Sequence, residues 1–159
     1  MTILFNTNIT QIASRTKVAL VQSCWHHDIV DKFRKSFLTE FKLGDGRIVD
    51  TFAVPGAFEL PLYVKQLAES EEYAAVIATG LVVDGGIYRH EFVASAVIDG
   101  LMRVQLDTGM PVFSGVLTPH DFMSEGRAEF FSEHFVIKGM ETAKACAEIL
   151  AAYDQHKAA

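Results

Sequence analysis

A continuous apolar run, a glycine turn and an amphipathic helix follow one another in residues 74–104, and this segment constrains the fold most strongly. The run AAVIATGLVV at residues 74–83 is typical of a strand that is buried on both faces of a sheet. The helical segment after it places one apolar face toward the core, formed by Phe92, Val93, Ala96, Val97, Leu101 and Val104. Such a strand belongs in a parallel sheet whose two faces are covered by helices.

The turn between this strand and this helix contains Gly85 and Gly86, with Arg89 and His90 at the helix entrance. A strand that passes through glycines into a helix points backbone N–H groups at a bound anion, which is the usual construction of a phosphate site. Alternatively, the glycines only supply the positive φ angles of a plain turn. The segment by itself leaves both interpretations open.

The rest of the chain repeats the alternation of strand and helix. Strands are predicted at residues 17–21, 48–54, 74–83 and 111–117. Helices are predicted between a cap at Asp28 and a stop at 44–46, over 57–68, from 92 to 108, briefly around 128–131, and over 138–153. This order predicts a three-layer α/β/α sandwich with a four-stranded parallel sheet in residues 17–159. Residues 1–16 are either an arm that docks on a neighbouring subunit or a frayed terminus.

Composition excludes several classes of protein. The 159 residues suffice for one domain, and a net charge of −6 provides no basic face for nucleic acid. No apolar run is long enough to span a membrane, and the first residues do not resemble a signal peptide. Cys24 and Cys146 are far apart in the sequence and are expected to be reduced thiols of a cytoplasmic protein. The histidines lack the spacing of a metal site, and the chain contains no P-loop, GxSxG or GxGxxG motif.

Four connections should meet where the parallel strands end, and ligands of such sheets bind there. They are residues 22–27, 55–59, 83–90 and 114–127. Trp25 in the first could stack on a flat heterocycle, or anchor a core or an interface. Glu59 in the second could bind a polyol, or it could complement the dipole at the start of a helix.

Three segments together resemble a known enzyme family. They are VPGAFELP at residues 54–61, GLVVDGGIYRHEFV at 80–93, and PVFSGVLTP at 111–119 with IKG at 137–139. They resemble lumazine synthase, the 6,7-dimethyl-8-ribityllumazine synthase of riboflavin synthesis. The likeness extends over residues 17–153, and Trp25 with GGIYRH resembles the second type of the family, found in alpha-proteobacteria.

The resemblance implies a flavodoxin-like fold, no cofactor and no metal. Its substrates are 5-amino-6-(D-ribitylamino)uracil and 3,4-dihydroxy-2-butanone 4-phosphate. The positions that match substrate contacts are Trp25 for stacking, Ala57, Phe58 and Glu59 for the ribityl chain, Leu81, Val82 and Val83 for the pyrimidine, and Ser114 from a neighbouring subunit. The positions assigned to phosphate are Gly86, Ile87, Lys138 and Arg127, which lies one position from the family's arginine in an ungapped alignment.

The chain departs from the family at the position of the catalytic histidine, the group that transfers a proton. An ungapped alignment puts the family's catalytic histidine at Arg89, and His90 follows it. Arginine stays protonated and cannot cycle as a base. We therefore expect Arg89 to orient substrates or stabilise phosphate, with turnover slower than in relatives that carry histidine. His90 remains the other candidate for proton transfer.

The resemblance also implies a homo-oligomer whose sites lie between two subunits of a pentamer, with small molecules as substrates. A dimer of pentamers is expected from the second type of the family. One alternative function is a flavin- or lumazine-binding protein with weak or vestigial catalysis, and another is a structural assembly. Generic flavodoxin-like nucleotide binding is less favoured because the phosphate turn follows the third strand, not the first.

Overall fold

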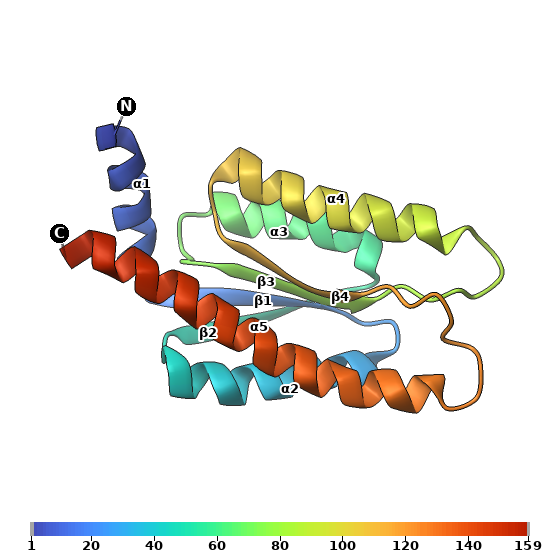
Figure 1. The fold of residues 1–159 in the computed structure, drawn as a ribbon. Coiled ribbons are helices and arrows are strands. Elements are labelled where there is room, and N and C mark those ends of the chain that lie inside the picture. The colour runs from blue at the N-terminus through green and yellow to red at the C-terminus, as the bar shows by residue number, and fades with distance from the viewer. Residues whose placement is uncertain (1, 159) are drawn as a thin grey trace.

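The computed structural model describes residues 2–158 and contains four strands within them. The strands are β1 (Lys17–Ser23), β2 (Ile48–Val54), β3 (Val76–Leu81) and β4 (Val112–Leu117). The helices are α1 (Thr2–Ala13), α2 (His27–Gly44), the short 3-10 helix η1 (Ala57–Glu59), α3 (Leu60–Glu69), α4 (His90–Thr108) and α5 (Arg127–Ala158). Each strand except β4 leads through a helix to the next strand, and β4 leads into α5 (Figure 1).

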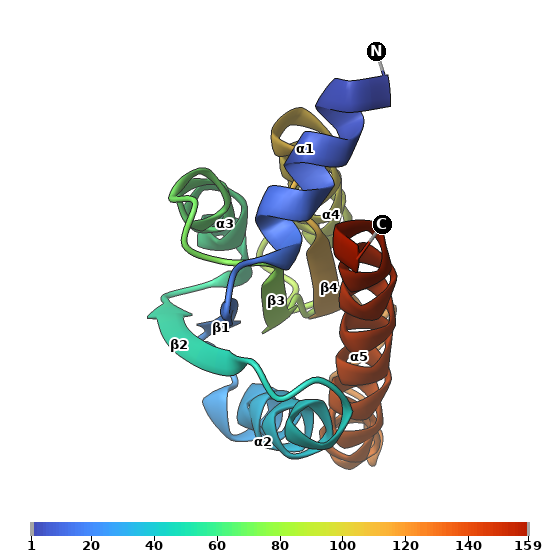
Figure 2. The same ribbon diagram turned by 90° about the vertical axis from the view of Figure 1, so that its left-hand side faces the viewer.

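The four strands form one parallel sheet in the order β2-β1-β3-β4. Helices α2 and α5 cover one face of the sheet, and α3 and α4 cover the other (Figure 2). This arrangement confirms the predicted three-layer α/β/α sandwich with a four-stranded parallel sheet. The connections after the strands gather at one end of the sheet, whereas both termini lie at the other end (Figure 1).

The core follows the apolar patterns of the sequence. Every residue of β3 is buried, and so is every residue of β1 after Lys17. On α2 the aromatic rings of Phe33, Phe37 and Phe41 are fully buried and stacked on one another, as the helical spacing predicts. These rings fill the layer between α2 and the sheet.

Three boundaries differ from the predictions. Asp28 does not cap α2: the helix begins at His27, after His26 takes a left-handed conformation, so Asp28 lies in the first turn. The helix expected over 57–68 is divided into η1 and α3, with Pro61 in the first turn of α3. The two helical pieces expected around 128–131 and 138–153 are one continuous helix, α5.

The first residues form α1, which packs beside the last turns of α5 (Figure 1). Ile12 and Ala13, at the end of α1, are buried against the rest of the chain. Docking of residues 1–16 on a neighbouring subunit stays a prediction. None of the helices in residues 2–158 is long and apolar enough to cross a membrane.

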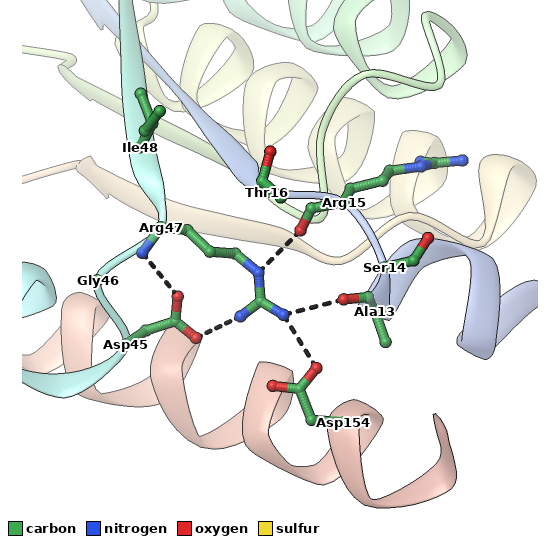
Figure 3. Close-up of a pocket in the computed structure, with 9 residues that line it drawn as sticks. All are labelled: Ala13, Ser14, Arg15, Thr16, Asp45, Gly46, Arg47, Ile48 and Asp154. Carbon is green, nitrogen blue, oxygen red and sulfur yellow. Dashed lines mark hydrogen bonds and ion pairs between the residues drawn. The ribbon is translucent and has the colours of Figure 1, made fainter. Parts of the chain in front are cut away.

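A hollow of about 660 Å³ lies near the termini, at the end of the sheet opposite the gathered connections (Figure 3). The guanidinium of Arg47 lines it and donates to the carbonyl oxygens of Arg15 and Ala13 at 2.9 and 3.1 Å. The same group pairs with the carboxylates of Asp45 and Asp154. Arg47 therefore joins the end of α1, the start of β2 and the end of α5, which is a structural role.

Candidate functional site

The connection after β1 is fixed to the connection after β2. Cys24 donates its backbone N–H to the carbonyl oxygen of Val54 at 2.9 Å, and Trp25 donates to that of Pro55 at 3.2 Å. These bonds extend the pairing of β1 and β2 beyond their ends and hold Trp25 at the end of the sheet. The Trp25 side chain is 61% exposed, so it is not a core anchor of this chain.

Position 56 must be glycine because two side chains lie against it. A Cβ atom there would be 2.8 Å from the Trp25 ring and 3.1 Å from Glu59 Oε2. Glu59 Oε2 accepts the backbone N–H of Gly56 at 2.8 Å, so the carboxylate caps the start of η1. Glu59 Oε1 accepts no hydrogen bond from residues 2–158 and is available to a ligand. Ala57 is buried beneath this pair, and Phe58 is exposed beside it.

The turn after β3 is exposed and has few neighbouring atoms. Val82 donates to the carbonyl oxygen of Leu117 at 3.0 Å, and this is the last bond between the ends of β3 and β4. Beyond it, Gly86 has φ of 76°, and a Cβ built at Gly85 or Gly86 would meet nothing within 4 Å. Ile87 is 92% exposed.

No residue in the described part of the chain accepts a hydrogen bond from the backbone N–H groups of Gly85, Gly86 or Ile87. Three successive N–H groups without a partner, close to the N-terminus of α4, make a site suited to an anion. The geometry therefore favours the phosphate interpretation of this turn over a plain connection. Leu81 and Val82 are buried behind it, and Val83 is half-buried.

Arg89 and His90 differ in their surroundings at the start of α4. The Arg89 side chain is 72% exposed, with its guanidinium 4.8 Å from the centre of the Phe92 ring. The His90 side chain is only 14% exposed. Arg89 Nε and His90 Nδ1 lie 3.8 and 3.6 Å from the same oxygen of Glu91. The pKa of Glu91 is lowered, first by its own backbone N–H and then by His90 and Arg89.

The second group of predicted site residues consists of Ser114 on β4 and of Arg127 and Lys138 on α5. Ser114 is exposed on β4, at the opposite edge of the sheet from β2. Arg127 Nε donates to the carbonyl oxygen of Asp121 at 3.2 Å, and its guanidinium lies against two phenylalanine rings at the start of α5. Lys138 Nζ lies 3.6 Å from Glu141 on the same helix. Within residues 2–158, no hydrogen bond or ion pair joins these side chains to Trp25, Glu59 or the glycine turn.

Sequence reasoning missed three residues that connect the site loops, namely His26, Asp84 and Phe122. Asp84 Oδ1 accepts the backbone N–H of Phe122, and the rings of Phe122 and His26 are in contact. These residues are far apart in the sequence and follow no periodic pattern, so only the folded chain identifies them. Among the described residues, no group of three His, Cys, Asp or Glu side chains could hold a metal ion.

Comparison with known proteins gives one consistent family. The sequence model of 6,7-dimethyl-8-ribityllumazine synthase matches residues 15–154. A protein of Bradyrhizobium diazoefficiens named 6,7-dimethyl-8-ribityllumazine synthase 2 is 52% identical over 88% of this chain and 86% of its own length. A 6,7-dimethyl-8-ribityllumazine synthase of Rhodococcus erythropolis is 56% identical over 81% of this chain and 85% of its own. A 6,7-dimethyl-8-ribityllumazine synthase 2 of Pseudomonas syringae is 54% identical over 84% and 81%.

Proposed function

The chain belongs to the 6,7-dimethyl-8-ribityllumazine synthase family, and we propose that it catalyses the family's reaction in riboflavin biosynthesis. The reaction condenses 5-amino-6-(D-ribitylamino)uracil with 3,4-dihydroxy-2-butanone 4-phosphate to 6,7-dimethyl-8-ribityllumazine, with release of phosphate and water. The chain is then a transferase of the cytoplasm.

One observation carries this proposal beyond family membership. The turn at Gly85–Ile87 offers backbone N–H groups that have no partner in residues 2–158. An exposed indole, Trp25, and a free carboxylate oxygen of Glu59 lie at the same end of the sheet. A phosphate site, a stacking surface and a polyol acceptor together suit one phosphorylated substrate and one ribitylated heterocycle.

The proposed chemistry needs orientation more than it needs a strong acid or base. The amine of the pyrimidine adds to the ketone and forms an imine with loss of water. Phosphate then leaves, and the second ring closes with loss of another water. Holding the two substrates in register supplies several kcal/mol of the barrier. The N–H groups of the turn and Arg89 stabilise the departing phosphate, while His90 is the nearby imidazole that can accept and donate a proton.

A direct assay tests this function. The purified chain is mixed with the two substrates, and the absorbance and fluorescence of 6,7-dimethyl-8-ribityllumazine are followed over the uncatalysed rate. We expect saturable product formation with release of one phosphate per lumazine. A chain that binds lumazine or flavin without accelerating the condensation would instead be a binding protein, and the proposal would be wrong.

We also propose that the site lies between two subunits of a homo-oligomer, a pentamer or a dimer of pentamers. Within residues 2–158, no hydrogen bond or ion pair joins Ser114, Arg127 or Lys138 to Trp25 or the glycine turn, which supports this arrangement because one substrate pair would need both groups. The second group of one subunit then completes the first group of its neighbour.

Mixed oligomers test whether the site is shared. Trp25→Ala and Arg127→Ala chains are each expected to be strongly impaired. When the two are unfolded together and reassembled in equal amounts, about a quarter of the sites should draw both intact groups from different chains and regain activity. A mixture of Trp25→Ala with Glu59→Gln is the matched control, because both changes fall in the same group and no site is restored. Equal activities in the two mixtures would place the site within one chain.

A further inference from the structure

Phe122, in the connection between β4 and α5, contacts two other connections of the site. Its side chain is 7% exposed, although the residues on either side of it are more open to solvent. Its backbone faces the turn after β3, and its ring faces the connection after β1. A buried aromatic residue in a polar loop usually fixes the loop, and here it fixes three loops at once.

The first contact is a hydrogen bond. Asp84 Oδ1 accepts the backbone N–H of Phe122 at 3.0 Å. Asp84 immediately precedes Gly85 and Gly86, where an added Cβ atom would meet nothing within 4 Å. The turn therefore has few packing contacts of its own, and the Asp84 carboxylate is what holds its first residue to the rest of the protein.

The second contact is between aromatic rings. The centres of the Phe122 and His26 rings are 5.2 Å apart, and the rings meet edge to face. His26 has a φ of 55°, a left-handed conformation that a histidine adopts only when its surroundings hold it there. Trp25 precedes His26 directly and its backbone N–H is bonded to Pro55, so the Phe122–His26 contact adds a second point of attachment to the loop that carries the indole.

We infer that Phe122 and Asp84 are positioning residues that hold the phosphate turn and the stacking indole in register. The inference rests on the proposed function, because it assigns one substrate to each contact. The Asp84 hydrogen bond positions the turn for the phosphorylated ketone. The Phe122 ring positions Trp25 for the pyrimidine. Neither side chain needs to touch a substrate.

The two contacts can be broken separately. Asp84→Ala removes the acceptor, and we expect the KM for 3,4-dihydroxy-2-butanone 4-phosphate to rise about tenfold, with little change for the pyrimidine. Asp84→Asn keeps an acceptor oxygen at the same place and should restore the KM to near that of the unchanged chain. Phe122→Leu keeps the backbone N–H and most of the apolar volume but loses the ring contact. It should raise the KM for the pyrimidine about fivefold and leave the other KM nearly unchanged.

The matched control is Asp107→Ala, which removes an exposed aspartate near the far end of α4 and should change neither KM. The inference is overturned if Asp84→Asn is as impaired as Asp84→Ala. It is also overturned if Asp84→Ala and Phe122→Leu raise both KM values alike, since general loosening of the site would do this.

A binding measurement separates this inference from the proposed function. Trp25 is the only tryptophan of the chain, so its fluorescence anisotropy reports on the stacking loop without any turnover. Phe122→Leu should lower this anisotropy, whereas Asp84→Ala should weaken the binding of inorganic phosphate in calorimetry. If the unchanged chain forms no lumazine but these two effects appear, the function is wrong and the positioning roles hold. If lumazine forms but neither effect appears, the positioning roles are wrong.

Discussion

At the scale of single residues, we expect Arg89 and His90 to decide how fast the proposed reaction can run. Arg89 is the more exposed of the two and stays protonated, so it can bind phosphate but cannot move a proton. We expect Arg89→His to raise kcat, because an imidazole can both accept and donate near neutral pH. Arg89→Ala should raise the KM for the phosphorylated substrate. Steady-state kinetics at several pH values measure both effects.

The opposite assignment has a distinct kinetic signature. If His90→Ala abolishes turnover while Arg89→Ala leaves kcat unchanged, His90 is the proton-transfer group and Arg89 is dispensable. The low exposure of His90 is compatible with a role in proton transfer, since bound substrates also exclude water from a site.

Asp31 makes stability depend on pH. On α2 its carboxylate accepts a hydrogen bond from Arg34 at 2.7 Å, and Lys35 lies 3.0 Å away. The Arg34 bond is the largest cause that lowers the Asp31 pKa from 3.8 to about 2, burial opposes it, and Lys35 adds to it. A carboxyl with a lowered pKa stabilises the fold above its unfolded pKa, and this contribution is lost as pH falls through the folded pKa. Asp31→Asn should therefore cost about 2 kcal/mol of unfolding free energy near neutral pH.

The pH dependence distinguishes this effect from simple damage to the helix. The cost of Asp31→Asn should shrink between about pH 4 and about pH 2, when Asp31 itself becomes protonated. Asp28→Asn, on the same helix but fully exposed, is the control and should change stability little. Urea unfolding at a series of pH values gives both curves, and a cost of Asp31→Asn that stays constant with pH would refute the ion-pair explanation.

Residues in periodic patterns were predictable from sequence, and residues in loops were not. Phe33, Phe37 and Phe41 follow helical spacing, and all three are buried. Phe122 and His26 are in contact but far apart in the sequence, so no local pattern predicts their interaction. Trp25 was a stacking candidate because of its place in a loop at the strand ends, the family resemblance assigned it to the pyrimidine, and that role stays a prediction.

At the scale of elements, α5 is the clearest difference from the sequence prediction. The sequence prediction gave two helical pieces, around residues 128–131 and over 138–153, with a break between them. In the structure the buried face runs through Phe131, Phe135 and Ala143 without a break, and nothing in the segment prevents a helix. Phe135 is fully buried, and its burial accounts for the continuity.

Helix α5 lies very close to α2 at Gly139. A Cβ atom at this position would overlap Ser36 Oγ and the carbonyl oxygen of Phe33, and the latter belongs to the backbone and cannot swing away. Gly139→Ala should therefore lower the unfolding free energy by about 3 kcal/mol, despite the better helix propensity of alanine. Gly85→Ala makes the same change where an added methyl group meets nothing within 4 Å, and it should be nearly neutral for stability. Equal urea midpoints for the two variants would mean that the helices can move apart at little cost.

At the scale of the whole molecule, the strand order sets where the predicted site residues lie across the sheet. The alternation of strands and helices predicted a parallel sheet, but it did not predict that β1 and β3 are central and that β2 and β4 form the edges. This order places Trp25 after the central strand β1 and Ser114 on the edge strand β4. We expect a second copy to bring Ser114 to the site that contains Trp25.

Two exposed apolar patches are suited to bind neighbouring copies. The α4 patch consists of Phe92, Ile98, Met102 and Leu106, and the α5 patch consists of Phe130, Val136, Ile137 and Met140. At about 100° per residue, each set lies within about 120° of its helix surface. A ring of more than two subunits needs two different patches on every chain, one for each neighbour, and this chain has both.

We expect the α4 patch of one subunit to contact the α5 patch of the next. Charged substitutions in each patch test this expectation. Met102→Glu and Ile137→Glu change side chains that are about equally exposed, at 51% and 50%. Each should yield monomers in light scattering. An equimolar mixture should yield a heterodimer, because one intact patch of each kind remains and a ring cannot close. Leu43→Glu, on an exposed residue of α2 outside both patches, should leave the oligomer intact. Monomers in the mixture would mean that the two patches do not pair with each other, and unchanged oligomers of both single variants would place the interfaces elsewhere.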